Sequence, residues 1–201
     1  TSVFTSPGAG TIEVSSAAPS PETMSVSLSP PEPMRSDLFR FFLLHDPQWD
    51  YRSLDLDRDY AYAVKKLGYM NATELDMSAF QKRGGKLLMY AGWADPVVPP
   101  AGTVAYFEDV SRAMGPARTS EFLRLFMVPG MGHCGGGPGA FQFDPAAALD
   151  AWVTTGKAPE RLTGRNPARN ISRPLCSYPA AARYKGPGGA EDVANWDCVK
   201  P

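Results

Sequence analysis

The sequence lacks the features that mark membrane proteins and nucleic-acid-binding proteins. Its 20 basic and 21 acidic residues leave a formal net charge of −1, and the basic residues are scattered rather than clustered. No apolar run approaches the roughly 18 residues that a membrane-spanning helix requires. Nucleic-acid affinity depends on concentrated positive charge. We therefore expect neither a nucleic acid nor a membrane as a partner of this chain.

Several short enzyme motifs are also missing. There is no Cys-x-x-Cys and no His-Glu-x-x-His, so the common zinc patterns are absent, and we expect no metal site. The glycine-rich run at residues 135–139 is not followed by the Lys-Ser/Thr of a phosphate-binding loop. No serine stands in the Gly-x-Ser-x-Gly arrangement of a nucleophile elbow. If the chemistry uses a serine nucleophile, we expect it in a segment that precedes residue 1.

Cysteine and histidine are scarce, with three and two residues respectively. Cys176 and Cys198 flank a tail rich in Tyr, Pro and Gly that shows little helical or strand pattern, and a disulfide would hold such a segment in place. Two unrelated buried thiols are the alternative. Cys134 is then left over beside His133, and an odd cysteine suggests a bonding partner elsewhere. This cysteine usage favours a secreted or periplasmic protein.

The regular part of the sequence predicts an α/β fold. The chain has 201 residues, 43% of them apolar, which is enough for one domain with a core. A strand buried on both faces is expected at 86–91 because its apolar run is continuous. The other expected elements are helices at 37–44, 57–68, 103–114 and 145–155 and a second strand at 121–128. A strand–helix–strand–helix order implies a parallel sheet with flanking helices.

The composition also suggests how the chain is divided. Residues 1–36 are rich in Ser, Pro, Gly and Thr and predict an irregular arm. Residues 37–160 carry the expected strands and helices of the core. Residues 161–201 form the tail that we expect a disulfide to tether.

One acid and one base follow the two predicted strands. Asp95 comes a few residues after the first strand, and His133 follows the second. The carboxyl ends of parallel strands gather functional groups, and neighbouring strands lie about 4.8 Å apart. Loops leaving such strands can bring a carboxylate within hydrogen-bond reach of an imidazole. In a Ser-His-Asp triad the Asp orients the His and the His takes the proton of the serine. The order Asp before His is that of α/β-hydrolases.

Other interpretations of these residues remain open. An Asp before a Pro, as at Asp95, is commonly structural and forms an Asx-type turn. His45 is the competing candidate base, although its His-Asp-Pro sequence favours a structural turn. Asp95, His133 and Cys134 could in principle bind zinc, but adjacent His and Cys are poorly spaced as ligands.

Several stretches resemble the tannase and feruloyl esterase family, which includes the enzyme that hydrolyses the mono-ester of terephthalate and ethylene glycol. The segment Gly-Met-Gly-His133-Cys134-Gly-Gly-Gly-Pro-Gly is the most specific of them. The others are Asp-Met-Ser-Ala-Phe-Gln-Lys-Arg-Gly-Gly-Lys-Leu from residue 76, Gly-Trp-Ala-Asp-Pro from residue 92 and Arg-Pro-Leu-Cys-Ser-Tyr-Pro from residue 173. The resemblance covers roughly residues 37–200.

The resemblance implies the C-terminal part of an α/β-hydrolase fold and hydrolysis of feruloyl- or galloyl-type esters of aromatic acids. Asp95 and His133 would be members of the triad. Cys134 would form a disulfide with a cysteine next to the nucleophile serine, and Cys176 would pair with Cys198. Residues 1–36 would be the end of a lid insertion.

The same resemblance implies what this chain does not carry. The serine and a structural calcium in the lid would both belong to an N-terminal segment or chain of the same protein, so no cofactor is expected here. That segment and a small aromatic ester would be the partners. The alternative is a non-catalytic truncated remnant or interaction module of the family.

Overall fold

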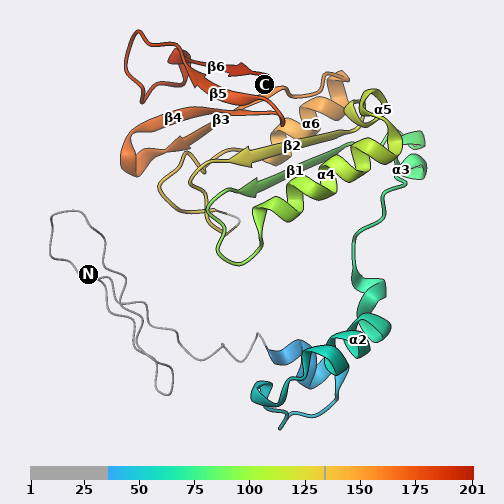
Figure 1. Ribbon diagram of the computed structural model, residues 1–201. Coiled ribbons are helices and arrows are strands. Elements are labelled where there is room, and N and C mark those ends of the chain that lie inside the picture. Colours follow the sequence, from blue (N-terminus) through green and yellow to red (C-terminus); the bar gives the residue numbers. More distant parts are fainter. Residues whose placement is uncertain (1–35, 134) are drawn as a thin grey trace, which may run out of the picture. The chain divides into compact units, whose positions relative to one another are not determined.

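The computed structural model of the protein describes residues 36–133 and 135–201 (Figure 1). The predicted arm therefore lies outside the described residues except for its last position, and Cys134 lies outside them as well. Contacts divide the chain into two compact units, Thr1–Ala72 and Thr73–Pro201. In the part that the structure describes, no helix combines the length and the apolar character needed to cross a bilayer.

The described part of the first unit contains short helical elements. They are the π-helix η1 (Leu38–Leu43), the 3-10 helix η2 (Tyr51–Ser53), α2 (Leu56–Leu67) and the 3-10 helix η3 (Gly68–Met70). The Asp55 side chain accepts a hydrogen bond from the backbone N–H of Arg58 and so caps α2. Acidic residues stand in the first turn of α2 and lysines in its last, which complements the helix dipole. Both helices predicted for this part of the chain are confirmed.

The second unit is built on two parallel strands. Its elements up to residue 155 are α3 (Ser78–Lys82), β1 (Leu87–Gly92), α4 (Pro100–Met114), α5 (Pro116–Ser120), β2 (Leu123–Val128) and α6 (Pro145–Thr155). The strands pair in parallel from Leu87 opposite Leu123 to Gly92 opposite Val128. The predicted order of strands and helices is thus confirmed. Helix α4 begins three residues earlier than predicted because Pro100 fits its first turn.

Alternating side chains of the two strands pack into two different apolar clusters. One apolar cluster joins α4 to one face of the sheet, and its members include Val110, Met114, Leu123, Leu87 and Met89. A second cluster on the opposite face includes Phe126, Val128, Met131, Leu175 and Leu88. Strand β2 is buried along most of its length, whereas β1 is only half-buried and its Tyr90 is 40% exposed. The burial on both faces that we expected for the strand at 86–91 is therefore not found in β1, which among the described residues pairs with β2 alone.

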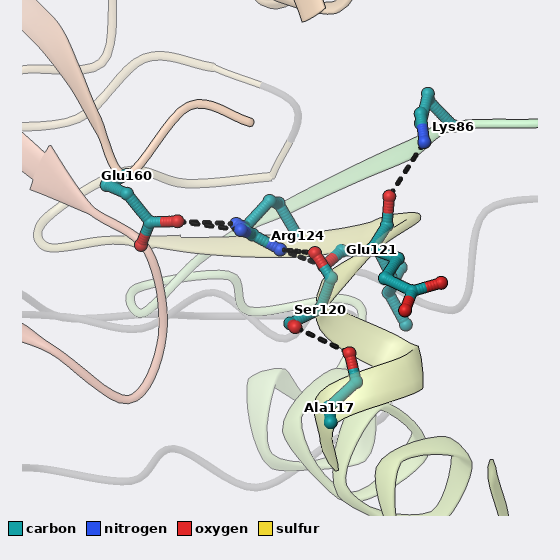
Figure 2. A network of polar contacts seen from close by, with 7 residues as sticks. Lys86, Ala117, Ser120, Glu121, Arg124 and Glu160 are labelled. Atoms are coloured by element: carbon teal, nitrogen blue, oxygen red, sulfur yellow. Dashed lines mark hydrogen bonds and ion pairs between the residues drawn. The ribbon is translucent and has the colours of Figure 1, made fainter. Parts of the chain in front are cut away.

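A polar network holds the amino-terminal ends of these strands (Figure 2). Lys86 donates from Nζ to the carbonyl oxygen of Glu121 at 2.8 Å. Arg124 donates to the carboxylate of Glu160 at 2.6 Å and also to the carbonyl oxygen of Ser120. Both cations lie over the ring of the buried Trp152 of α6, at 5.5 and 5.4 Å from its centroid. The network therefore fixes α6 against the end of the sheet opposite to the loops that carry Asp95 and His133.

The tail differs from the prediction, because it is not irregular. It forms two antiparallel pairs, β3 (Arg161–Asn166) with β4 (Ile171–Cys176) and β5 (Ala181–Tyr184) with β6 (Trp196–Val199), separated by the 3-10 helices η4 (Pro167–Arg169) and η5 (Val193–Asn195). These strands escaped the sequence pattern because they are short and carry residues disfavoured in strands, such as Pro174 and Gly164.

The predicted disulfide between Cys176 and Cys198 is present and joins β4 to β6. The tail is also attached to the parallel sheet, since the backbone N–H of Tyr178 donates to the carbonyl oxygen of Leu125 in β2 at 2.8 Å. The two antiparallel pairs thus form one body with the core of the second unit.

Candidate active site

The loops that follow β1 and β2 are tied together by their backbones. The N–H of Trp93 donates to the carbonyl oxygen of Val128, and the N–H of Ala94 donates to that of Met131, both at 3.0 Å. Gly92 makes this approach possible, because a Cβ at its position would collide with the Met131 carbonyl. The loops that follow the adjacent parallel strands β1 and β2 therefore lie side by side at the carboxyl ends of these strands.

The structure brings the two predicted site residues into direct contact. Nδ1 of His133 lies 2.8 Å from Oδ2 of Asp95, a distance typical of a hydrogen bond between an imidazole and a carboxylate. The Asp95 side chain is only 8% exposed, whereas that of His133 is 45% exposed. The carboxylate is thus sheltered behind an imidazole that reaches the surface of the described part of the chain.

The other carboxylate oxygen of Asp95 organises its own loop. Oδ1 accepts the backbone N–H groups of Val97 and Val98 at 2.8 and 2.9 Å. Burial alone would raise the pKa of Asp95, but the hydrogen bonds from Val98, His133 and Val97 outweigh burial and lower the pKa below its ordinary value of 3.8. The Asx-type turn that the sequence left open is therefore real, and the same carboxylate also contacts His133.

The loop between β2 and α6 carries His133 and is called the histidine loop. Some of its glycines lie so close to other backbone atoms that a side chain would not fit at their positions. The N–H of Gly139 donates to the carbonyl oxygen of Gly130 at 3.0 Å, and a Cβ at Gly139 would collide with the carbonyl of Pro129. The buried side chain of Asn166 in β3 donates to the carbonyl oxygens of Gly139 and Gly137 at 2.9 and 3.3 Å. The loop is therefore fixed from two sides.

Sequence reasoning did not identify Asn166 as part of the site's support. An asparagine in a segment without a clear strand pattern carries no motif, and its contact is made with glycine carbonyls far away in the sequence. Only the pairing of β3 with β4 and the packing of that pair behind the histidine loop reveal its role.

The structure gives less information on the remaining candidates. His45 is an exposed residue of the first unit with a positive φ of 54°, in a turn where Asp46 accepts the N–H of Gln48, as its sequence suggested. Cys134 lies outside the described residues, so its predicted disulfide stays a prediction. Among residues 36–133 and 135–201, no group of three His, Cys, Asp or Glu side chains could hold a metal ion.

The contact with Asp95 engages Nδ1 of His133 and leaves its second ring nitrogen, Nε2, for proton transfer. With Nδ1–H donating to Asp95, Nε2 of His133 is the nitrogen that can accept a proton. The serines from Ser53 onward make no hydrogen bond to His133 in the described part of the chain. None of these serines is therefore placed by a hydrogen bond as a partner of His133.

A comparison with protein families identifies the class of protein that shares these features. A family model described as tannase and feruloyl esterase matches residues 34–199. The match includes Asp95, His133 and both cysteines of the disulfide in the tail.

Individual relatives agree with this result. An uncharacterized esterase of Xanthomonas campestris is 40% identical over 192 residues, which cover 75% of this chain and 33% of that protein. The mono(2-hydroxyethyl) terephthalate hydrolase of Piscinibacter sakaiensis is 39% identical over 146 residues, or 70% of this chain and 24% of the relative. The chain thus spans about a quarter to a third of the length of these curated relatives.

A solved structure shows the same arrangement of elements. The crystal structure of feruloyl esterase B from Aspergillus oryzae superimposes with a TM-score of 0.73 at 29% sequence identity. The superposition covers 87% of this chain and 38% of that structure. Helices and parallel strands of the second unit therefore correspond to part of an α/β-hydrolase-type esterase.

Proposed function

The chain belongs to the tannase and feruloyl esterase family, and on that premise we propose that it carries the acid and the base of a serine carboxylic-ester hydrolase. The single observation that carries the proposal is the hydrogen bond of 2.8 Å between His133 and a sheltered Asp95 at the carboxyl ends of parallel strands. The nucleophile serine comes from a segment of the protein N-terminal to residues 1–201. Family membership supports this, together with the absence of a nucleophile elbow in the sequence.

In the proposed reaction, the serine Oγ attacks the ester carbonyl while Nε2 of His133 takes the hydroxyl proton. Asp95 stabilises the resulting imidazolium through its hydrogen bond to Nδ1. The imidazolium then gives the proton to the departing alcohol, which leaves an acyl-enzyme. Water attacks the acyl-enzyme with His133 again as the base, and the carboxylic acid and the free serine are regenerated.

We further propose esters of aromatic acids as substrates. The proposal is supported by family membership and by relatives named as a feruloyl esterase and as a mono(2-hydroxyethyl) terephthalate hydrolase. The disulfide of the tail fits a secreted or periplasmic location. A disulfide from Cys134 to a cysteine next to the serine, as the resemblance implies, would tie the histidine loop to the nucleophile.

The proposal is tested by replacing His133 with alanine in the full-length protein. We expect turnover of an aromatic ester such as ethyl ferulate to fall by at least about 10³-fold, because no other group could accept the serine proton. His45→Ala is the matched control and should leave turnover unchanged. Activity of the His133→Ala variant within about tenfold of the wild type would refute the assignment.

A further inference from the structure

A cavity of about 420 Å³ lies in the second unit between the end of β2, the histidine loop and the strands of the tail. It is lined mainly by apolar side chains, among them Trp93, Met127, Pro174, Leu175, Tyr178 and Trp196. Its size falls in the range of roughly 300–1,000 Å³ that is typical of small-molecule sites. Neither Asp95 nor His133 lines it, so it is separate from the proposed catalytic pair.

Arg173 is the one charged residue among those described that lines this cavity. Its guanidinium lies 4.6 Å from the centroid of the Trp196 ring, and Nη1 donates to the carbonyl oxygen of Ser172 at 2.8 Å. In the described part of the chain, Arg173 forms no ion pair with any carboxylate. A guanidinium has five N–H donors, and most of them have no acceptor here.

A half-buried cation without an ion-pair partner at the wall of an apolar cavity favours a ligand that joins an anionic group to an apolar body. Guanidinium groups bind carboxylates through two parallel hydrogen bonds, which a neutral group cannot replace. The aromatic and proline side chains around Arg173 favour a flat apolar body over a polar one. The position of the guanidinium over the Trp196 ring restricts the side chain and so reduces the entropy lost when an anion binds.

We propose that this cavity is a binding site for an aromatic monocarboxylate, with its carboxylate on Arg173 and its ring among the apolar side chains. The site is distinct from the proposed ester-hydrolysis centre. An acid of this class is what the proposed reaction releases, so the cavity would hold a product molecule away from His133. Its occupancy does not depend on the nucleophile serine.

The test is calorimetric titration of the full-length protein with cinnamate, and with cinnamamide as the neutral probe of the same shape. We expect saturable binding of cinnamate with a Kd below about 1 mM and at least tenfold weaker binding of cinnamamide. Arg173→Met should weaken cinnamate binding at least about tenfold, since it removes the charged donor. Ala182→Leu fills the cavity without altering charge and should weaken binding as well.

Arg183→Met is the matched control. Arg183 is an exposed neighbour of Ala182 on β5 and does not line the cavity. The Arg183→Met variant should therefore bind cinnamate as tightly as the wild type. The proposal is overturned if the wild type does not bind cinnamate, if cinnamamide binds equally well, or if Arg173→Met and Ala182→Leu both keep wild-type affinity. Each of these results concerns binding alone and leaves the turnover of the His133→Ala variant as the separate test of the proposed function.

Discussion

At the scale of single residues, Asp95 combines two roles that sequence reasoning treats as alternatives. One carboxylate oxygen accepts two backbone N–H groups and shapes the loop, and the other contacts His133. Because the loop is fixed by the same side chain that orients the imidazole, the position of His133 depends on the backbone that Asp95 organises. A substitution that keeps the turn but removes the charge separates these roles.

Asp95→Asn is such a substitution. The amide oxygen can still accept from Val97 and Val98, but the amide nitrogen would face Nδ1 of His133 and favour the wrong tautomer. We expect kcat of the full-length protein on an aromatic ester to fall by roughly 10³–10⁴-fold, with KM little changed. Asp150→Asn, an exposed change on α6, is the control. Equal kcat in the wild type and Asp95→Asn would mean that Asp95 serves only the turn.

At the scale of elements, helix α2 carries a carboxylate whose ionisation the fold favours. The side chain of Asp59 is 7% exposed and pairs with Arg58, and it also accepts the backbone N–H of Asp55. Mainly the hydrogen bonds from Arg58, and then that from Asp55, lower the pKa of Asp59 from 3.8 to about 2. The Asp59 carboxylate therefore stays ionised to a lower pH in the folded protein than in the unfolded chain.

This shift predicts a defined pH dependence. The folded-state pKa lies below the unfolded-state value, so the stabilisation by Asp59 is fully present above about pH 4 and is lost as the pH falls through 2. The difference in free energy of unfolding between the wild type and Asp59→Asn should thus be constant from pH 5 to 7 and shrink between about pH 4 and 2, as measured by urea unfolding. Asp57→Asn, also in the first turn of α2, should show a smaller change. A difference that does not vary down to pH 2 would contradict the shifted pKa.

The network at the amino ends of the strands predicts which surface arginine matters for stability. The Arg124 side chain is 11% exposed, contacts Glu160 (Figure 2) and lies over Trp152. That of Arg112 is 74% exposed and, among the described residues, pairs only with Asp109. Arg124→Met should lower the free energy of unfolding by about 1–3 kcal/mol, because its carbonyl acceptors and Trp152 lose their partner. Arg112→Met should cost less than about 0.5 kcal/mol. Urea unfolding of both variants decides the point, and equal losses would refute the ranking.

At the scale of the whole molecule, the tail is held both by strand pairing and by a covalent link. The disulfide joins Cys176 to Cys198, which are 22 positions apart in the sequence. Replacing both cysteines by serine should lower the free energy of unfolding by about 3 kcal/mol, since the unfolded chain regains the freedom of the segment between them. Thermal unfolding without reductant provides the measurement, and the same comparison in reductant is its control, because the wild type and the double variant should then unfold alike. Equal stability of the two proteins without reductant would show that strand pairing alone secures the tail.

The sequence predicted the parallel strands and the acid–base pair because each depends on local signals. The apolar runs at 86–91 and 121–128 and the order of Asp95 before His133 do not require knowledge of distant contacts. The strands of the tail were missed because pairing across the chain, rather than propensity, stabilises a strand that contains Pro174. Asn166 was missed for the same reason, since its partners are carbonyl groups of a remote loop.

The central claim is that His133 and Asp95 activate a serine that lies outside residues 1–201. The most direct measurement is labelling of the full-length protein with a fluorophosphonate, followed by peptide mapping of the modified serine. We predict one labelled serine, located N-terminal to this chain, and loss of labelling in the His133→Ala variant. A label on a serine within residues 1–201, or the absence of any His133-dependent label, would contradict the claim, and the latter result would favour a non-catalytic member of the family.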